Sequence, residues 1–282
     1  DEVEDELEKY VCQSADNELA RPTGDGIGKI EFNSNLAHLY AHFVRHTIDT
    51  SLEGLTIVYD GANGAASSVG PEILSGLGAK VININVNPDG LNINHHCGST
   101  HIEGLQVAVQ QHNADLGIAN DGDADRCLLV DEKGQVLDGD QIMLLCALKL
   151  KEEGKLKGDT IVGTVMSNIG FHKAAEELGM KTVSTAVGDR YVLEYMREHN
   201  LSVGGEQSGH VIFLDHNTTG DGMLTAVQVA ALMKEKKQPL SELAGIMTKY
   251  PQVLVNVRVA TKTGWEDNDL IKAAIVTAEG EL

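Results

Sequence analysis

The feature that most limits the fold is a pattern that occurs twice: a short apolar strand, a polar turn, a helix ending in Leu-Gly, and a second strand. The first copy has its strands at 55–59 and 81–84, and the second has them at 160–163 and 181–183. A strand that returns through a helix to a parallel neighbour is a βαβ unit, with functional loops at the carboxyl ends of its strands. The sequence therefore predicts an α/β fold of two tandem α/β domains, with mixed, mainly parallel sheets and helices on both faces. Whether the two domains arose by duplication stays open.

Composition around these units predicts the domain boundaries. Residues 1–20 are rich in acidic groups, with apolar residues near helical spacing, which is typical of a solvated helix. The chain ends with a strand-like stretch at 253–259 and a helix-like stretch at 268–278, together too short for a domain. We expect the last helix of a first domain with a hinge, a second domain, a third domain and the start of a fourth domain, at 1–24, 25–137, 138–251 and 252–282. Both ends are thus expected to be remnants of flanking domains.

Charge and hydropathy exclude several kinds of partner. The 282 residues carry a formal net charge of −20, which repels nucleic acid phosphates and anionic membrane surfaces. No apolar run approaches the roughly 18 to 20 residues that cross a bilayer. The four cysteines match no zinc spacing and no dense disulfide framework, so we expect reduced thiols in a cytoplasmic protein. A phosphorylated substrate would need a local concentration of positive charge.

Three aspartates alternate in the segment Asp-Gly-Asp-Ala-Asp-Arg at 121–126, which joins strand-like stretches at 114–119 and 127–131. On a straight strand, alternate residues lie about 6.6 Å apart, too far to share an ion that takes oxygen at about 2.1 Å. The segment must therefore curl, and Gly122 would permit this by adopting φ > 0.

The curled loop predicts a magnesium site. Three carboxylates would leave some coordination positions of the ion open for a phosphate oxygen. Mg²⁺ is commonly bound in this way in enzymes of phosphoryl transfer. Arg126 could hold another oxygen of the same phosphate, so the loop would supply the positive charge that the substrate needs. The predicted metal ligands are Asp121, Asp123 and Asp125.

Two other interpretations of this loop remain open from the sequence. The first is a turn of solvated acidic side chains between strands. The second is a calcium loop of EF-hand type, in which Leu128 would take the apolar position and Glu132 the last ligand position. Arg126 stands where that loop needs Gly, and strands flank the segment where helices are needed.

A second loop, Gly204-Gly-Glu-Gln-Ser-Gly-His at 204–210, lies between strand-like stretches at 201–203 and 211–214. In an extended loop, Glu206, Ser208 and His210 would point to the same side. Such a row of acceptors and donors suits vicinal sugar hydroxyls. The alternative is a glycine-rich bend in a hairpin, in which His210 is merely hydrogen-bonded.

Two further segments are less informative by themselves. The stretch 87–101 is dense in turn-forming residues, and we expect its His95 and His96 to face solvent. Gly188-Asp189-Arg190 offers an arginine that could reach a phosphate or could cap the following helix.

Taken together, the motifs DGDADR at 121–126, GGEQSGH at 204–210, VGDRYV at 187–192 and NPDGLNINHHCGSTH at 87–101 resemble the α-D-phosphohexomutase family. The resemblance covers nearly the whole chain, with the motifs in the family order. In this family four domains surround one cleft and supply, in turn, a phosphorylatable serine, a magnesium loop, a sugar-binding loop and a phosphate-binding loop. The resemblance implies a mutase with Mg²⁺ as cofactor and a phosphorylated hexosamine as substrate, and it leaves room for a homodimer of the full-length protein.

The resemblance also implies roles for individual residues. It makes Asp121, Asp123 and Asp125 the metal ligands, places Arg126 beside the phosphoserine, and gives His210 a part in proton transfer or phosphate binding. The implied substrate-binding residues are Glu206, Ser208, Gly188, Asp189 and Arg190. Ala124 replaces a glycine that is common in the family loop, so we expect φ < 0 at this position.

The implied reaction passes a phosphoryl group from phosphoserine to glucosamine 6-phosphate, reorients the 1,6-bisphosphate, and returns the other phosphoryl group to the serine. No segment of this sequence resembles the serine loop of the first domain or the phosphate loop of the fourth. We therefore expect the 282-residue chain alone to fold without catalysing turnover. Glucose and mannose phosphates remain open as alternative substrates.

Overall fold

The structure is a computed structural model that describes residues 2–12, 22–31, 33, 35–255, 257–259, 261 and 263–281. The chain divides into two compact units, 1–40 and 41–282. The first unit contains the helix α1 (Glu2–Cys12), the 3₁₀ turn η1 (Gly24–Gly26) and the start of α2 (Asn35–Arg45). The predicted N-terminal helix is confirmed over Glu2–Cys12, and its expected continuation to residue 20 lies outside the described residues.

The first half of the second unit is built on a five-stranded sheet with the order β2-β1-β3-β4-β5. β1 pairs in parallel with β2 and β3, whereas β4 pairs antiparallel with β3 and β5. β3 is buried along its whole length, which explains its uninterrupted run of apolar and small residues. The strands are β1 (Thr56–Asp60), β2 (Lys80–Ile84), β3 (Leu116–Asn120), β4 (Cys127–Asp131) and β5 (Val136–Leu137).

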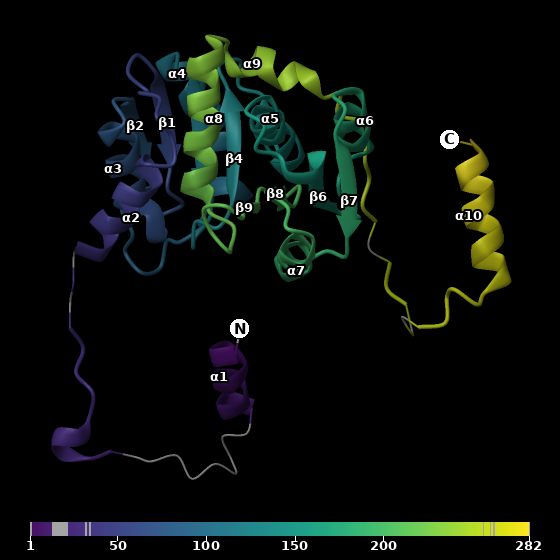
Figure 1. The fold of residues 1–282 in the computed structure, drawn as a ribbon, viewed down its shortest axis with the longest axis horizontal. Helices are drawn as coiled ribbons and strands as arrows, with labels where there is room; N and C mark the ends of the chain where they lie inside the picture. Colours follow the sequence, from purple (N-terminus) through teal and green to yellow (C-terminus); the bar gives the residue numbers. More distant parts are fainter. Residues whose placement is uncertain are drawn as a thin grey trace. The chain divides into compact units, whose positions relative to one another are not determined.

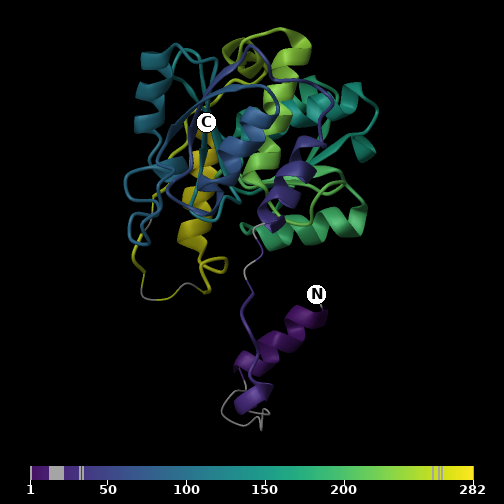
Figure 2. The ribbon, with the colours of Figure 1, turned by 90° about the vertical axis from the view of Figure 1, so that its left-hand side faces the viewer.

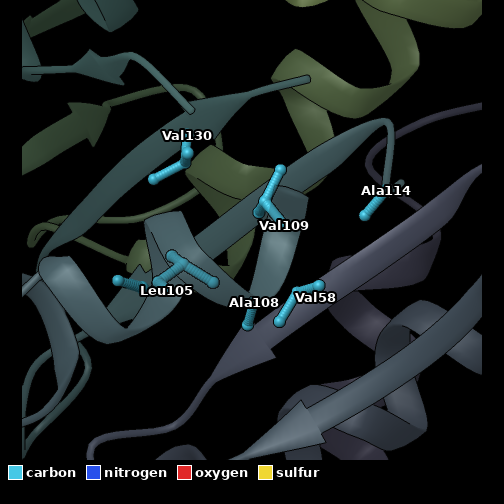
Figure 3. Packing of buried hydrophobic residues seen from close by; sticks show 7 residues of the cluster. Val58, Leu105, Ala108, Val109, Ala114 and Val130 are labelled. Atoms are coloured by element: carbon cyan, nitrogen blue, oxygen red, sulfur yellow. The ribbon is translucent and has the colours of Figure 1, made fainter. Parts of the chain in front are cut away.

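Helices cover both faces of this sheet. Val58, Ala119 and Val130 on the strands pack against Leu105 and Val109 of the helix on one face (Figure 3). On the other face two helices contact the strands and each other. The helix of the first face is α4 (Glu103–His112), and those of the second are α3 (Val69–Gly76) and α8 (Gly222–Lys236); the short turns η2 (Ala65–Ser67) and η3 (Gly98–Thr100) lie in the connecting loops.

The second half is built on a four-stranded sheet with the order β7-β6-β8-β9. β6 pairs in parallel with β7 and β8, and β9 pairs antiparallel with β8. The predicted mixed sheets are therefore confirmed in both halves. The strands are β6 (Thr160–Thr164), β7 (Lys181–Thr185), β8 (Val203–Gly205) and β9 (Val211–Phe213).

Helices again lie on both faces. One helix packs its Val192 and Met196 on Val162 and Ile212, while two helices contact each other and the opposite face. The first is α7 (Asp189–His199), and the other two are α5 (Gly139–Glu152) and α6 (Ile169–Glu177); the remaining elements are η4 (Lys157–Asp159), α9 (Leu240–Leu243) and η5 (Ala244–Ile246).

Helix α8 joins the two halves, because it contacts α3 and β4 as well as α5 (Figure 1). Its residues 222–233 are all buried, which fits a helix that is apolar on every side. α8 stands upright in both views, whereas α7 is seen end-on in Figure 1 and lies horizontally, below α8, in Figure 2.

The two sheets share one topology, since β2-β1-β3-β4 matches β7-β6-β8-β9 in order and direction. Even the helix ends agree: Gly78 and Gly179 follow α3 and α6 with φ of 95° and 71°, the left-handed conformation in which glycine commonly ends a helix. In both sheets the loop between the third and fourth strands is the one singled out by sequence, at 121–126 and at 206–210. The shared topology supports duplication.

Two predictions about the termini had different outcomes. The predicted helix at 268–278 is confirmed as α10 (Asp269–Glu281). The predicted strand at 253–259 is wrong, since none of the described residues of that stretch pairs with another strand. Val253 is 84% exposed, and β propensity without a partner edge does not make a strand.

Two findings concern the described residues as a whole. None of their helices is long and apolar enough to cross a membrane. The four cysteines are free thiols, with Cys12 exposed and Cys97, Cys127 and Cys146 buried.

Candidate metal and sugar site

The three aspartates gather at one end of the first sheet. β3 and β4 form an antiparallel pair, so the segment 121–126 is a hairpin loop. Each aspartate can place one carboxylate oxygen within 4.8 Å of those of the other two. Asp121 is buried, Asp125 is half-buried and Asp123 is exposed, so the cluster opens to solvent on one side.

The loop curls at a residue other than the one expected. Gly122 does not have a positive φ, whereas Ala124 does, at 64°. Both the expected φ > 0 at Gly122 and the expected φ < 0 at Ala124 are therefore wrong. The Ala124 conformation is held by two hydrogen bonds: its N–H donates to Asp121 O at 3.2 Å, and its carbonyl accepts from Gly222 N at 2.9 Å.

Gly122 is needed for space. A Cβ at this position would lie 2.7 Å from Ile93 Cδ1 and 2.8 Å from Asn94 Nδ2. Gly64 also approaches closely, since its Cβ would lie 2.3 Å from the Gly122 carbonyl oxygen. Only glycine lets the loops after β1 and β2 pack this tightly on the 121–126 loop.

The electrostatics of the cluster fit a divalent cation. Burial, and then the charges of Asp121 and Asp123, raise the pKa of the Asp125 carboxyl to about 7. Arg126 Nε lies 3.6 Å from Asp121 and 3.9 Å from Asp125, so one arginine is close to two of the three carboxylates. Asp125 Oδ1 is buried and has no hydrogen-bond partner among the described residues. A hard cation with oxygen ligands would satisfy this atom and remove the repulsion.

The calcium-loop alternative does not survive in the structure. Its last ligand, Glu132, lies beyond the far end of the five-residue strand β4, about 17 Å along the strand from the loop. There the Glu132 carboxylate accepts hydrogen bonds from the side-chain hydroxyl and the main-chain N–H of Ser241.

The second loop is a tight turn between β8 and β9. Gly209 N donates to Glu206 O at 3.0 Å, and Glu206 N donates to His210 O at 2.8 Å. The expectation of an extended loop with three side chains on one side is therefore wrong. Ser208 Oγ lies 3.4 Å from Glu206 Oε2, so these two stay together, but His210 turns inward and is only 3% exposed.

The two loops are joined to each other. Arg126 and His210 form an isolated antiparallel β-bridge, and Cys127 N donates to Gly209 O at 3.0 Å. Gly209 has a φ of 99°, and a Cβ there would lie 2.5 Å from the Cys127 carbonyl oxygen. The hairpin of the first sheet thus continues into the hairpin of the second, and it brings the acidic cluster beside Glu206.

His210 sits between two carboxylates. Its Nε2 lies 3.6 Å from Asp125 Oδ2 and 3.7 Å from Asp189 Oδ2, and neither ring nitrogen has a hydrogen-bond partner among the described residues. Burial lowers the pKa of the imidazole, and the Asp189 charge opposes this effect. The ring packs on Gly220, where a Cβ would lie 2.4 Å from Nε2. A neutral imidazole held this way could accept or donate a proton.

The start of α7 meets the second loop. Gly188 N donates to Glu206 Oε1 at 2.9 Å, which orients that carboxylate, and Asp189 is the residue that faces His210. Arg190 is placed differently from the other predicted residues. Its exposed side chain donates from Nε to Glu194 Oε1 at 2.7 Å.

A cavity of about 380 Å³ lies over both loops. Three of the predicted residues line it, whereas four others were not predicted as site residues. The predicted ones are Arg126, Glu206 and Ser208, and the others are Thr164, Met166, Val187 and Gln207. Thr164 is the last residue of β6 and Met166 lies two residues beyond it, so their place at a strand's carboxyl end was the available signal.

Two other predicted features have clear places. His95 and His96 are exposed, as expected. Asp60, at the carboxyl end of β1, was not singled out by sequence, yet its buried carboxylate accepts hydrogen bonds from Asn85 Nδ2 and Gly98 N. It holds the loop 85–98 close to the site.

Comparison with known proteins identifies the family. Residues 36–134 match "Phosphoglucomutase/phosphomannomutase, alpha/beta/alpha domain II", and residues 138–250 match domain III of the same family. Curated relatives include proteins named phosphoglucosamine mutase from Symbiobacterium thermophilum, 54% identical, and Bacillus subtilis, 49% identical. Each match covers 100% of this chain and 63% of the relative, so the chain spans less than two thirds of their length.

Solved structures agree on the fold. A phosphoglucomutase/phosphomannomutase family protein from Burkholderia thailandensis superposes with a TM-score of 0.71 at 25% identity, over 88% of this chain and 52% of that one. The N-acetylphosphoglucosamine mutase of Aspergillus fumigatus superposes with a TM-score of 0.62 at 23% identity, over 80% of this chain and 55% of that one. With two consecutive domains matched and curated relatives at about 50% identity along its whole length, the chain belongs to the phosphoglucomutase/phosphomannomutase family of α-D-phosphohexomutases.

Proposed function

We propose that the protein is a phosphoglucosamine mutase, which interconverts glucosamine 6-phosphate and glucosamine 1-phosphate through a phosphoserine and a 1,6-bisphosphate. The product would serve UDP-N-acetylglucosamine and cell-wall precursor synthesis. The observation that carries the proposal is the bridge between Arg126 and His210, because it sets an acidic cluster beside a loop of sugar-binding chemistry. The names of the curated relatives support the choice of substrate. We assign the metal loop to a domain at 25–137 and the sugar loop to one at 138–251.

In this proposal Asp121, Asp123 and Asp125 hold Mg²⁺. The Aspergillus enzyme was crystallised with N-acetylglucosamine 6-phosphate and magnesium, which supports the same cofactor here. When bound, the ion supplies positive charge that stabilises the transferring phosphoryl group. Arg126 is half-exposed beside the cluster, so its guanidinium can hold a phosphate oxygen in the same cavity.

The second loop positions the sugar. Glu206 accepts from Gly188 N through Oε1, which leaves its other oxygen, close to Ser208 Oγ, for a sugar hydroxyl. Burial lowers the pKa of His210, and its ring lies between Asp125 and Asp189, so it is suited to move a proton or to contact a phosphate.

Arg190 has a more limited part in this proposal. It would have to exchange Glu194 for a phosphate, because its Nε already donates to that carboxylate. Free thiols and a phosphorylated substrate favour the cytoplasm as the site of the reaction.

Sugar identity is tested by titrating the Mg²⁺-loaded chain with the 6-phosphates of glucosamine, glucose and mannose in a calorimeter. We expect glucosamine 6-phosphate to bind most tightly, and the other two to bind measurably because the sugar loop has hydroxyl-binding groups. Tightest binding of the glucose or mannose compound would instead identify a phosphoglucomutase or phosphomannomutase of the same family. No binding of any of the three would contradict the proposed sugar site.

A further inference from the structure

Asn120 closes the metal loop from inside the protein. It is the last residue of β3, directly before Asp121, and it is fully buried. Its Nδ2 donates to Arg126 O at 2.7 Å, so the side chain spans the five residues that carry the three carboxylates. A hydrogen bond across the base of a hairpin loop fixes the separation of the loop's two ends.

Tyr59 holds this amide in place from the neighbouring strand β1. Its hydroxyl donates to Asn120 Oδ1 at 3.0 Å, and it also lies 3.2 Å from Ala66 O. The contact fixes the direction of the amide, because the reversed amide would put its oxygen against the Arg126 carbonyl. Burial raises the pKa of the Tyr59 hydroxyl, which therefore stays a donor.

The main chain at two glycines packs directly against the Asn120 and Tyr59 side chains and leaves them no room to change rotamer. A Cβ at Gly222 would lie 2.2 Å from Asn120 Nδ2, and one at Gly70 would lie 2.5 Å from the Tyr59 hydroxyl oxygen. The start of α8 and the start of α3 thus press directly on the pair. Such packing is typical of groups that hold one rotamer.

Two other carbonyls of the loop accept hydrogen bonds from main-chain donors. Gly122 O accepts from Ala65 N at 2.8 Å, and Ala124 O accepts from Gly222 N at 2.9 Å. No side-chain substitution removes these two donors.

Two side chains close the loop on the main chain of Arg126: Asn120 Nδ2 donates to its carbonyl, and Asp121 Oδ1 accepts from its N–H at 3.3 Å. Because Asp121 is itself a proposed metal ligand, Asn120 is the side chain whose removal tests the closure without removing a ligand.

We propose that Asn120 and Tyr59 are positioning residues of the metal loop, which fix its curvature so that Asp121, Asp123 and Asp125 face one ion. This inference rests on the proposed metal site. Groups that orient metal ligands change metal affinity by about 10- to 100-fold when they are removed. A pair that merely filled the core would change the unfolding temperature and leave the affinity of the folded chain unaltered.

The test uses the 282-residue chain with Tyr59→Phe, which removes one hydroxyl, and Asn120→Ala, which removes the closing donor. Mn²⁺ serves as the probe because it prefers the same oxygen ligands as Mg²⁺, and free Mn²⁺ is measured by electron paramagnetic resonance. Ser202→Ala is the matched control: Ser202 is buried, and its hydroxyl donates to Lys155 O and accepts from Lys157 N, remote in sequence from the loop.

We expect the Mn²⁺ dissociation constant to rise about 10-fold in Asn120→Ala, less in Tyr59→Phe, and not at all in Ser202→Ala. The double variant should lose no more than Asn120→Ala alone, because the two groups act through one contact. In the metal-free chain, amide hydrogen exchange of 121–126 should quicken in both variants and stay unchanged in the control.

Unchanged Mn²⁺ affinity and unchanged exchange in a folded Tyr59→Phe variant would overturn the inference, and this conservative variant decides if Asn120→Ala does not fold. If the unaltered chain binds Mn²⁺ and the variants bind it equally well, the positioning role alone fails. If the unaltered chain binds no Mn²⁺, the proposed metal site fails together with the inference.

Discussion

The carbonyl oxygen of Gly209, in the loop between β8 and β9, accepts a hydrogen bond at 3.0 Å from the N–H of Cys127, the first residue of β4 in the other sheet. Beside them, Arg126 and His210 complete the bridge. The contact is made by main-chain atoms, so it sets the distance between the acidic cluster and the 206–210 loop independently of the side chains.

Substitution of Gly209 tests this joint. A Cβ would lie 2.5 Å from the Cys127 carbonyl oxygen at a φ of 99°, so Gly209→Ala should cost about 3 kcal/mol of unfolding free energy or more. Gly154→Ala is the control, since Gly154 has a φ of 69° but no atom within 4 Å of its Cβ position. It should cost only the left-handed strain of about 1 kcal/mol. Equal losses in urea unfolding would show that the joint is not tightly packed.

The acidic cluster predicts opposite effects of one substitution with and without metal. Asp123→Asn removes one of three gathered charges, so the unfolding temperature of the metal-free chain should rise. In excess Mg²⁺ the variant should unfold at a lower temperature than the unaltered chain, because weaker binding gives less stabilisation. Scanning calorimetry in EDTA and in Mg²⁺ measures the two unfolding temperatures. Glu177→Gln, at an exposed position, is the control. A shift of the same sign in both buffers would exclude Asp123 as a ligand.

Glu206 is expected to act on the ligand rather than on the fold. Glu206→Gln keeps an acceptor for Gly188 N but loses the charge, and the affinity for glucosamine 6-phosphate should fall about tenfold, with little change in unfolding temperature. Glu198→Gln, an exposed acid on α7, should leave the affinity unaltered. Calorimetric titration decides, and an unchanged dissociation constant in Glu206→Gln would remove this carboxylate from the sugar site.

Asp140 predicts a dependence of stability on pH. It is fully buried in the first turn of α5, its Oδ2 accepts from Asn168 N at 2.6 Å, and burial raises its pKa to about 6 from an ordinary 3.8. A raised carboxyl pKa means that the stabilisation is fully present below about pH 4 and is lost as the pH rises through 6.

The difference of about two pKa units between the folded and unfolded chain corresponds to roughly 3 kcal/mol of unfolding free energy. Asp140→Asn should therefore stabilise the chain at pH 7.5, and the gain should shrink toward pH 4. Thermal unfolding at several pH values measures this, with the exposed Glu176→Gln as control. A gain that is constant across this range would be inconsistent with a buried ionised carboxylate.

Local patterns were sufficient to predict most of the fold. β3 and β4 are short apolar runs bounded by acidic turns, and they form where the pattern indicates. The stretch 253–259 has the same strand-like composition, but its described residues, 253–255 and 257–259, do not form a strand. A strand depends on a partner edge, and local sequence does not specify one.

The sequence predicted which types of residue form the candidate site, but it did not predict how their backbone and side chains are arranged. The positive φ of Ala124 is set by hydrogen bonds with Asp121 and with Gly222, a residue far along the chain. The inward turn of His210 likewise depends on the bridge to Arg126. Such contacts between distant segments leave no periodic signal in the sequence, so a loop could be recognised without its shape being predictable.

The continuous pair of hairpins has a consequence for the proposed reaction, in which the sugar phosphate would be presented twice, once by each end. Because main-chain hydrogen bonds join the 121–126 loop to the 206–210 loop, neither loop can change its position without the other between the two presentations. In the proposed reaction the joined loops would therefore form one fixed floor of the cavity, and the sugar would have to reverse its direction above it.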